Sequence, residues 1–135
     1  MQSVSKHYLH AIFATKRRRP SLPVRIDEPL HEYMGGIFRG RKCRLLEAGG
    51  GSDHRHVLFE LHADQSLSEL IRAVKAGSSR WLRKQLGNWD GWQNGYGAFS
   101  VCERHLISVA EYIRNQREHH EEQTLRAELG RLLGA

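Results

Sequence analysis

Hydrophobic and polar residues alternate with the period of a β-strand in four stretches of the chain. These stretches are residues 4–15, 43–48, 54–62 and 96–101. A glycine-rich turn at residues 49–52 joins the second and third stretches, which are therefore expected to form an antiparallel hairpin. The pattern predicts four strands.

Apolar residues recur every three or four positions in three other stretches, which is the spacing that places them on one face of a helix. These stretches are residues 22–39, 66–85 and 103–119. Gly40 fits the C-terminal end of the first helix, and Ser66 with Glu69 forms a capping-box pattern at the start of the second. Residues 121–135 are expected to form a short amphipathic tail helix.

The predicted elements follow one another in the order β-α-β-β-α-β-α. This order predicts an α+β domain of the ferredoxin-like or RNA-recognition-like kind, an antiparallel sheet with its helices on one face. The chain has 135 residues, which is the size of one domain, so residues 1–135 are expected to fold as a single unit.

The chain has a formal net charge of +6 and an isoelectric point near 9.7. A chain this basic is expected to bind a polyanion. Nucleic acid fits better than a membrane surface, because the sequence has neither a long apolar run nor the apolar core of a signal peptide. Its two cysteines, Cys43 and Cys102, lack CxxC spacing and indicate a reduced, cytoplasmic protein.

Basic side chains gather after the first strand, after the first helix and on the polar side of the second helix. Such side chains could contact the phosphate backbone of DNA or could simply be solvated. The candidates for DNA binding are Lys16, Arg17, Arg18, Arg19, Arg39, Arg41, Lys42 and Arg80.

Two histidines separated by one residue stand at the start of the third strand. Because successive side chains of a strand point to opposite faces, His54 and His56 share a face, about 6.6 Å apart, and can bind one divalent ion. Tyr112 and Gln116 are four residues apart and share one face of the last predicted helix. Together the four side chains suit a metal-assisted attack of a phenol on a phosphate.

Further motifs accompany these residues along the chain. The motifs are Thr15-Lys16-Arg17-Arg18-Arg19-Pro20, His54-x-His56-Val57-Leu58-Phe59, Gly77-Ser78-Ser79-Arg80-Trp81, Trp92-Gln93-x-Gly95-Tyr96-Gly97-Ala98-Phe99-Ser100-Val101 and Tyr112-Ile113-x-x-Gln116-x-Glu118-His119-His120. In their order and spacing they resemble the single-tyrosine HUH transposases of small bacterial insertion sequences, the IS200-like transposase family. The resemblance covers about residues 8–128.

This resemblance implies one HUH transposase domain over residues 1–135, with its catalytic tyrosine helix at about 103–119. Tyr112 would be the nucleophile, and the two histidines with Gln116 would bind Mg²⁺ or Mn²⁺. Single-stranded DNA would be cleaved and rejoined through a 5′-phosphotyrosine at hairpin-bearing element ends. The implied protein is a homodimer in the bacterial cytoplasm, in which Tyr112 of one subunit completes the histidine site of the other.

The chain departs from the family pattern between the two histidines, where a bulky apolar residue is usual and Arg55 stands here. Its side chain points to the opposite strand face, so the histidine pair is retained. Arg55 favours an alternative, a decayed or domesticated DNA-hairpin-binding protein without catalysis. A nearer alternative is the related tyrosine transposases associated with dispersed palindromic repeats. A structural zinc protein is disfavoured, because the sequence has no Cys/His quartet with zinc-site spacing.

Overall fold

The four predicted strands form one antiparallel sheet in the order β2-β3-β1-β4. The strands are β1 (His7–Ala14), β2 (Arg44–Gly49), β3 (His54–Leu61) and β4 (Gly97–Val101). The computed structural model describes residues 2–119, so the expected tail helix at 121–135 lies outside the described residues. β1 and β3 are the two central strands, and each is hydrogen-bonded to a neighbour on both sides.

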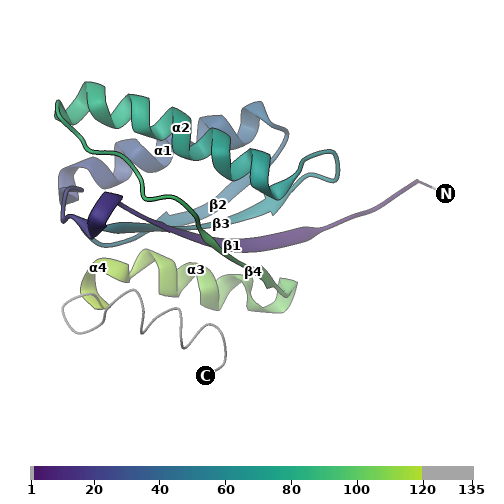
Figure 1. The fold of residues 1–135 in the computed structure, drawn as a ribbon. Helices are drawn as coiled ribbons and strands as arrows, with labels where there is room; N and C mark the ends of the chain where they lie inside the picture. The colour runs from purple at the N-terminus through teal and green to yellow at the C-terminus, as the bar shows by residue number, and fades with distance from the viewer. Residues whose placement is uncertain (1, 120–135) are drawn as a thin grey trace.

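Helices α1 (Asp27–Gly40) and α2 (Leu67–Leu86) cover one face of the sheet (Figure 1). The start of α2 is capped as the sequence predicts, because Ser66 Oγ accepts a 3.1 Å hydrogen bond from the backbone N–H of Glu69. The main hydrophobic core lies between these helices and the sheet. Its fully buried members include Ala11, Leu30, Met34, Phe38, Val57, Phe59, Leu70 and Val74.

Helices α3 (Leu106–Arg114) and α4 (Gln116–His119) lie on the opposite face of the sheet (Figure 1). The ferredoxin-like α+β class is confirmed, but the expectation of helices on one face does not hold for α3 and α4. The physical reason is that both faces of β1 are apolar, with Ile12 on one and Phe13 on the other, so each face needs a cover. The buried apolar side chains between the sheet and α3 are Ile12 and Leu58 of the strands and Ile113 of α3 itself.

The helix predicted at residues 22–39 begins later than its apolar pattern suggests, at Asp27. Pro23 is extended, and the backbone N–H of Leu22 donates a 2.9 Å hydrogen bond to the carbonyl oxygen of Ser52. The segment before α1 is therefore tied to the β2–β3 turn and does not continue the helix.

The helix predicted at residues 103–119 is divided into three pieces. A 3-10 turn at Glu103–His105 precedes α3, and Asn115 separates α3 from α4 with φ −94° and ψ 17°. The backbone N–H of Asn115 still bonds to the carbonyl of Glu111 at 3.1 Å, so the direction of the chain is largely kept.

The longest helix of the described part is α2, with 20 residues. It is amphipathic, since Leu70 and Val74 are buried while Arg72 and Arg80 are exposed. Within residues 2–119, no helix has both the length and the apolar character needed to cross a membrane.

Candidate active site

The two candidate metal-binding histidines lie side by side on the face of β3 that α3 covers. His54 and His56 are both fully buried, and their ring centroids are 5.0 Å apart with an interplanar angle of 77°. β1 supports them from the side, because Ala14 pairs with His54 and Ile12 pairs with His56. The strand thus places both imidazoles on one face, as the sequence spacing predicts.

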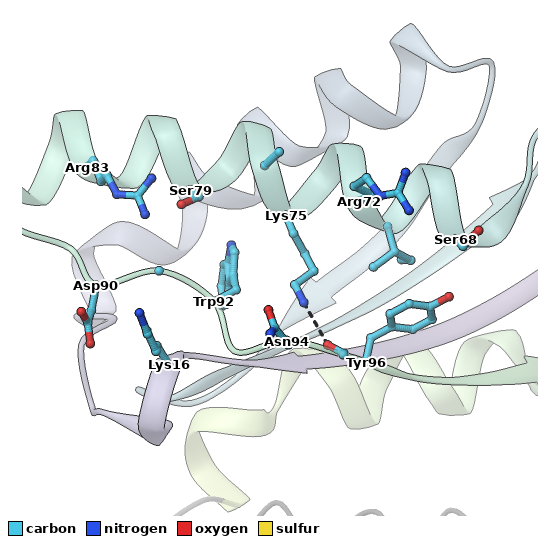
Figure 2. A pocket seen from close by; sticks show the side chains of 14 residues that line it. Lys16, Ser68, Arg72, Lys75, Ser79, Arg83, Asp90, Trp92, Asn94 and Tyr96 are labelled. Carbon is cyan, nitrogen blue, oxygen red and sulfur yellow. Dashed lines mark hydrogen bonds between the residues drawn. The ribbon is translucent and has the colours of Figure 1, made fainter.

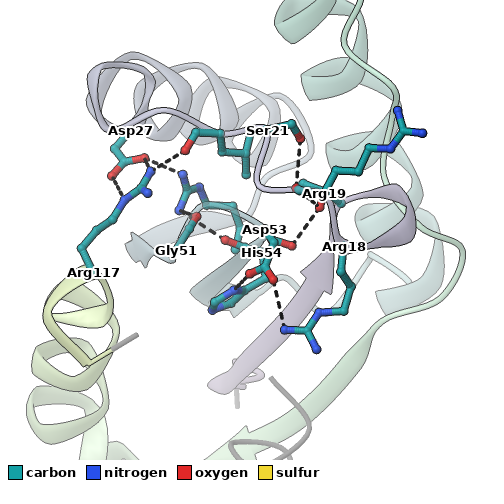
Figure 3. A network of polar contacts seen from close by, with 11 residues as sticks. Arg18, Arg19, Ser21, Asp27, Gly51, Asp53, His54 and Arg117 are labelled. Carbon is teal, nitrogen blue, oxygen red and sulfur yellow. Dashed lines mark hydrogen bonds and ion pairs between the residues drawn. The ribbon is translucent and has the colours of Figure 1, made fainter. Parts of the chain in front are cut away.

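Asp53 orients the first histidine. His54 Nδ1 donates a 2.7 Å hydrogen bond to Asp53 Oδ1, and Arg18 Nη2 donates one of 3.1 Å to Oδ2 (Figure 3). Burial alone would raise the pKa of the Asp53 carboxyl, but the hydrogen bond and charge of His54, with those of Arg18, outweigh burial and lower it. With its proton on Nδ1, the His54 ring has its lone pair on Nε2, as in metal-binding histidines held by a carboxylate.

His10 of β1 orients the second histidine, His56, through a hydrogen bond to its Nδ1. His10 Nε2 and His56 Nδ1 are 2.8 Å apart and share a buried hydrogen bond. The tautomer in which His56 Nδ1 is the donor places the His56 lone pair on Nε2. Each candidate ligand therefore has one neighbour that fixes the direction of its ring.

The candidate nucleophile and the candidate amide ligand reach this face from α3 and α4. The Tyr112 ring centroid lies 5.9 Å from that of His56, and the two planes are at 86°. Gln116 is fully buried, and its Nε2 donates a 3.2 Å hydrogen bond to the carbonyl oxygen of Tyr112. Because the amide nitrogen is turned toward the α3 backbone, Oε1 is the Gln116 atom suited to a metal ion.

Arg55, between the two histidines, is buried on the opposite face of β3 and paired with a carboxylate. Its Nη2 donates to Asp27 Oδ1 at 2.5 Å, and its Nη1 donates to the carbonyl oxygen of Gly51 at 3.2 Å. Arg117 of α4 donates to the same carboxylate, from Nη2 to Oδ1 at 2.8 Å and from Nε to Oδ2 at 3.0 Å (Figure 3). Asp27 thus connects β3 to the residue that comes after Gln116.

The charge cluster around Asp27 consists of two guanidinium groups and one carboxylate. Burial lowers the pKa of Arg55 to about 10, and the charge of Asp27 opposes this shift, so Arg55 stays charged at neutral pH. Burial, together with the charge of Arg55, also lowers the pKa of His31 on α1 to about 4. His31 is therefore neutral at neutral pH.

The donor set that the chain offers a metal ion is two imidazole nitrogens and one amide oxygen, from His54, His56 and Gln116. Within residues 2–119, no three His, Cys, Asp or Glu side chains gather as a metal-ligand group. Two nitrogens and a neutral oxygen suit a divalent ion that also takes oxygen ligands, and leave coordination positions for phosphate. The donor set can hold a divalent metal ion.

Four of the eight candidate DNA-binding residues lie beside this site, in the turn Lys16–Arg18 (η1) and at Arg19. Arg17 and Arg18 adopt left-handed backbone conformations, with φ of 57° and 54°. Such conformations cost a non-glycine residue on the order of 1 kcal/mol and are common at functional sites. The turn is held by Arg18 on Asp53 and by an ion pair of 3.3 Å from Arg19 to Asp90.

The remaining candidates lie elsewhere. Arg39, Arg41 and Lys42 are at the C-terminal end of α1, about 20 Å along this helix from Asp27. Arg80 is exposed on α2, on the face of the sheet away from the histidines. The structure therefore brings only the basic turn close to the candidate active site.

Sequence reasoning missed four polar side chains of the site, His10, Asp27, Asp53 and Arg117. Two of them had a local signal: Asp53 directly precedes the histidine pair, and His10 is a polar residue on an otherwise apolar strand face beside Ile12. Asp27 and Arg117 had none, because their contact joins residues 90 positions apart.

Comparison with known proteins identifies the family of the chain. The sequence model of the family described as "Transposase IS200 like" matches residues 3–116. The chain belongs to the IS200-like transposase family. The expected enzyme class, DNA transposase, is confirmed by relatives that carry this name.

Two of these relatives show how far the similarity extends. The transposase for insertion sequence element IS200 of Salmonella typhimurium is 28% identical over 116 residues, covering 81% of this chain and 76% of that protein. The ISDra2 transposase TnpA of Deinococcus radiodurans is 22% identical over 116 residues, covering 81% of this chain and 83% of that protein. Both similarities span most of the two chains compared.

Solved structures support the fold. A crystal structure from Deinococcus radiodurans R1, described as that of a transposase, matches with a TM-score of 0.68 and 23% identity, over 87% of this chain and 95% of the other. A REP-associated tyrosine transposase bound to a REP hairpin matches with a TM-score of 0.58 and 16% identity, over 84% of this chain and 70% of that one.

Proposed function

We propose that this transposase cleaves and rejoins single-stranded DNA at hairpin-bearing ends of an insertion sequence, through a covalent 5′-phosphotyrosine at Tyr112. One observation carries the proposal: the Tyr112 ring lies 5.9 Å from the His56 ring, which lies 5.0 Å from the His54 ring. A phenol beside two imidazoles unites a nucleophile and metal ligands, a combination that suits metal-assisted phosphoryl transfer.

His54 and His56, through their Nε2 atoms, and Gln116, through Oε1, would hold Mg²⁺ or Mn²⁺. When bound, the ion would supply Lewis acidity at the phosphoryl oxygens of the scissile group. Asp53 and His10 support this role, because each hydrogen-bonds to Nδ1 of one imidazole and thereby directs Nε2 toward the ligand position.

In the cleavage step, the hydroxyl oxygen of Tyr112 forms a bond to phosphorus, and the bond from phosphorus to the 3′ oxygen of the preceding nucleotide breaks. The phenol loses its proton, and the departing 3′ oxygen gains one and leaves as a 3′-hydroxyl. The 5′ phosphate remains attached to Tyr112. Rejoining is the reverse reaction, in which a 3′-hydroxyl attacks the phosphotyrosine and displaces the phenol. The free energy of the phosphodiester bond is conserved, so no nucleotide cofactor is required.

The partner would be single-stranded DNA folded into hairpins, approached by the basic turn Lys16–Arg18 and Arg19. The hairpin in the structure of the REP-associated tyrosine transposase supports this choice of partner. Phosphate contacts from such a turn fix the register of a nucleic acid without reading its sequence. The net positive charge of the chain supports a polyanionic partner, and the site of action would be the bacterial cytoplasm, on DNA.

The working unit would be a homodimer with active sites shared between subunits. Within one chain, Tyr112 already lies beside His56, so sharing would require α3 and α4 of one subunit to occupy the same place on the other. Mixing Tyr112→Phe and His56→Ala chains tests this. Shared sites would restore activity in the mixture, whereas sites complete within one chain would leave it inactive.

The reaction itself is tested with end-labelled single-stranded DNA carrying the element's hairpins, in Mg²⁺ or Mn²⁺. We expect a protein–DNA adduct that survives denaturing electrophoresis and that Tyr112→Phe and His56→Ala both abolish. Hairpin binding without any adduct in either metal would support the non-catalytic binder instead. Arg55 is the feature in favour of that alternative, and its pairing with Asp27 on the opposite face of β3 weakens the case.

A further inference from the structure

A pocket of about 500 Å³ lies between α2 and the segment 90–96 that leads into β4 (Figure 2). Its volume is in the range of ligand-binding cavities. The pocket opens on the α2 side of the sheet, whereas the histidines and Tyr112 lie on the α3 side. It is therefore separate from the candidate active site.

Hydrogen bonds between α2 and the loop hold the walls of the pocket in place. Lys75 Nζ donates to the carbonyl oxygen of Gln93 at 2.7 Å. It also donates to the carbonyl oxygen of Gly95 at 2.9 Å, the contact drawn in Figure 2. Trp92 Nε1 donates to Ser78 Oγ at 3.0 Å. Burial lowers the pKa of the Lys75 ammonium, as expected for a cation that is used inside the wall. The pocket is preformed, so little ordering is needed when a ligand enters.

The lining of the pocket is basic and carries one exposed aromatic ring. Its cations are Lys16, Arg72, Lys75 and Arg83. They face one carboxylate, Asp90, which is already paired with Arg19. Tyr96 is 40% exposed, and Figure 2 shows it across the pocket from Arg72. An aromatic face with cations beside it suits a ligand that has both a planar ring and a phosphate.

We propose that this pocket binds one nucleotide of the single-stranded DNA substrate, with its base on Tyr96 and its phosphate at Arg72. The inference rests on the proposed function, which supplies the class of ligand. Stacking on an aromatic side chain tolerates any base, because every base has a π face. A guanidinium such as that of Arg72 matches the geometry of phosphate oxygens. The pocket would hold the strand without selecting its sequence.

The basic turn connects this pocket to the candidate active site. The backbone N–H of Thr15 donates to the carbonyl oxygen of Asp53 at 2.9 Å, and that of Lys16 donates to Gly91 at 2.9 Å. Two adjacent residues are thus fixed, one beside His54 and the other at the pocket. A strand seated in the pocket would pass the turn to reach the histidines, so the pocket would set which phosphodiester lies beside Tyr112.

The test measures binding where no cleavage can occur. Fluorescence anisotropy of a fluorescein-labelled ten-nucleotide oligothymidylate is monitored with the full chain in EDTA. We expect Tyr96→Ala to weaken binding about tenfold, whereas Tyr96→Phe keeps the ring and stays within about twofold. Arg72→Ala should lower the slope of log K against log salt by about 0.7, as expected for one lost phosphate contact to a single strand. Arg104→Ala removes an exposed charge outside the pocket and should change neither quantity.

A second readout locates the bound strand directly. Photo-cross-linking with an oligonucleotide that contains 5-iododeoxyuridine should label the peptide that carries Tyr96. Equal DNA affinity of wild type and Tyr96→Ala, with both proteins shown to be folded by their thermal unfolding curves, would overturn the assignment of the pocket. Cross-links confined to the Arg39–Lys42 region would overturn it as well. If the metal-dependent adduct at Tyr112 still forms in that case, only the pocket assignment fails. If wild type binds no single-stranded DNA, the proposed substrate fails with it.

Discussion

Arg55 of β3 and Arg117 of α4 donate to the same atom, Oδ1 of Asp27. Arg55 is fully buried, so Asp27 is the counter-charge that permits an arginine inside the domain. Through Arg117, the same carboxylate also anchors the segment that carries Gln116. One acidic residue thus joins the unusual residue of the histidine motif to the end of the candidate catalytic helix.

This relationship predicts an asymmetry between two substitutions. Asp27→Asn leaves a buried guanidinium without its counter-charge and should lower the free energy of unfolding by about 3–5 kcal/mol. Arg55→Val leaves Asp27 paired with Arg117 and should cost about 1 kcal/mol or less. In the Arg55→Val background, Asp27→Asn should then cost much less than it does alone. Urea denaturation of wild type, the two single variants and the double variant measures the free energies of unfolding for this double-mutant cycle. An equal loss of stability from Asp27→Asn in both backgrounds would contradict the predicted coupling.

Asp53 is expected to govern metal affinity through His54. Asp53→Asn removes the charge that holds the His54 ring, and loss of such a partner typically weakens metal binding by about 10–100-fold. Titration calorimetry with Mn²⁺ measures the affinity without any DNA. The matched control is Asp64→Asn, since Asp64 is an exposed carboxylate whose ion-pair partner is Lys42. An unchanged Mn²⁺ affinity in Asp53→Asn would show that Asp53 does not govern metal binding through His54.

Gly49 of β2 lies directly against the backbone of α3. A Cβ atom built there would lie 2.0 Å from the carbonyl oxygen of Ile113. Gly49→Ala should therefore displace α3 and Tyr112, and should abolish the DNA adduct while the core under α1 and α2 persists. Hydrogen exchange should show faster exchange at residues 106–114 with little change in α2.

The control for this substitution is Gly40→Ala, because a Cβ at Gly40 would meet no atom within 4 Å. Gly40→Ala should leave the adduct and the exchange rates unaltered. A fully active Gly49→Ala protein would mean that α3 can move without consequence for the chemistry.

His31 predicts a dependence of stability on pH. Its pKa is lowered from the usual 6.5 to about 4 in the folded chain, chiefly by burial, so the unfolded chain binds a proton more readily. Stability from this source is present above pH 6.5 and is lost as the pH falls toward 4. The loss is about 3 kcal/mol at most. His31→Gln should flatten this part of the profile, measured as the difference in unfolding free energy between the two chains. Parallel profiles for the two chains would contradict the assignment.

Features that depend on neighbouring residues alone could be predicted from the sequence. Alternation identified all four strands, and the His54-x-His56 spacing placed both imidazoles on one face because strand geometry fixes that relation. Ser66 marked the start of α2 correctly for a similar reason, since a cap acts on the first turn of its own helix.

Features that depend on contacts between distant segments could not be predicted in this way. The face on which α3 packs is decided by the apolar side chains of β1 and β3 together, not by the pattern of α3. The burial of Arg55 depends on its ion pair with Asp27, which is 28 positions away in the sequence. The His10–His56 contact likewise spans 46 positions and becomes visible only when β1 and β3 are paired in register.

The alternation of β3 has a consequence for how such a protein can change over evolutionary time. Positions 54, 56 and 58 face α3 and the candidate active site, whereas positions 55, 57 and 59 face α1 and α2. Selection acts on the second set of positions through the stability of the fold, and on the first set also through the proposed reaction. An arginine at position 55 is therefore a change that a lineage can tolerate where a residue such as Asp27 neutralises it, since the histidines remain on the other face of the strand.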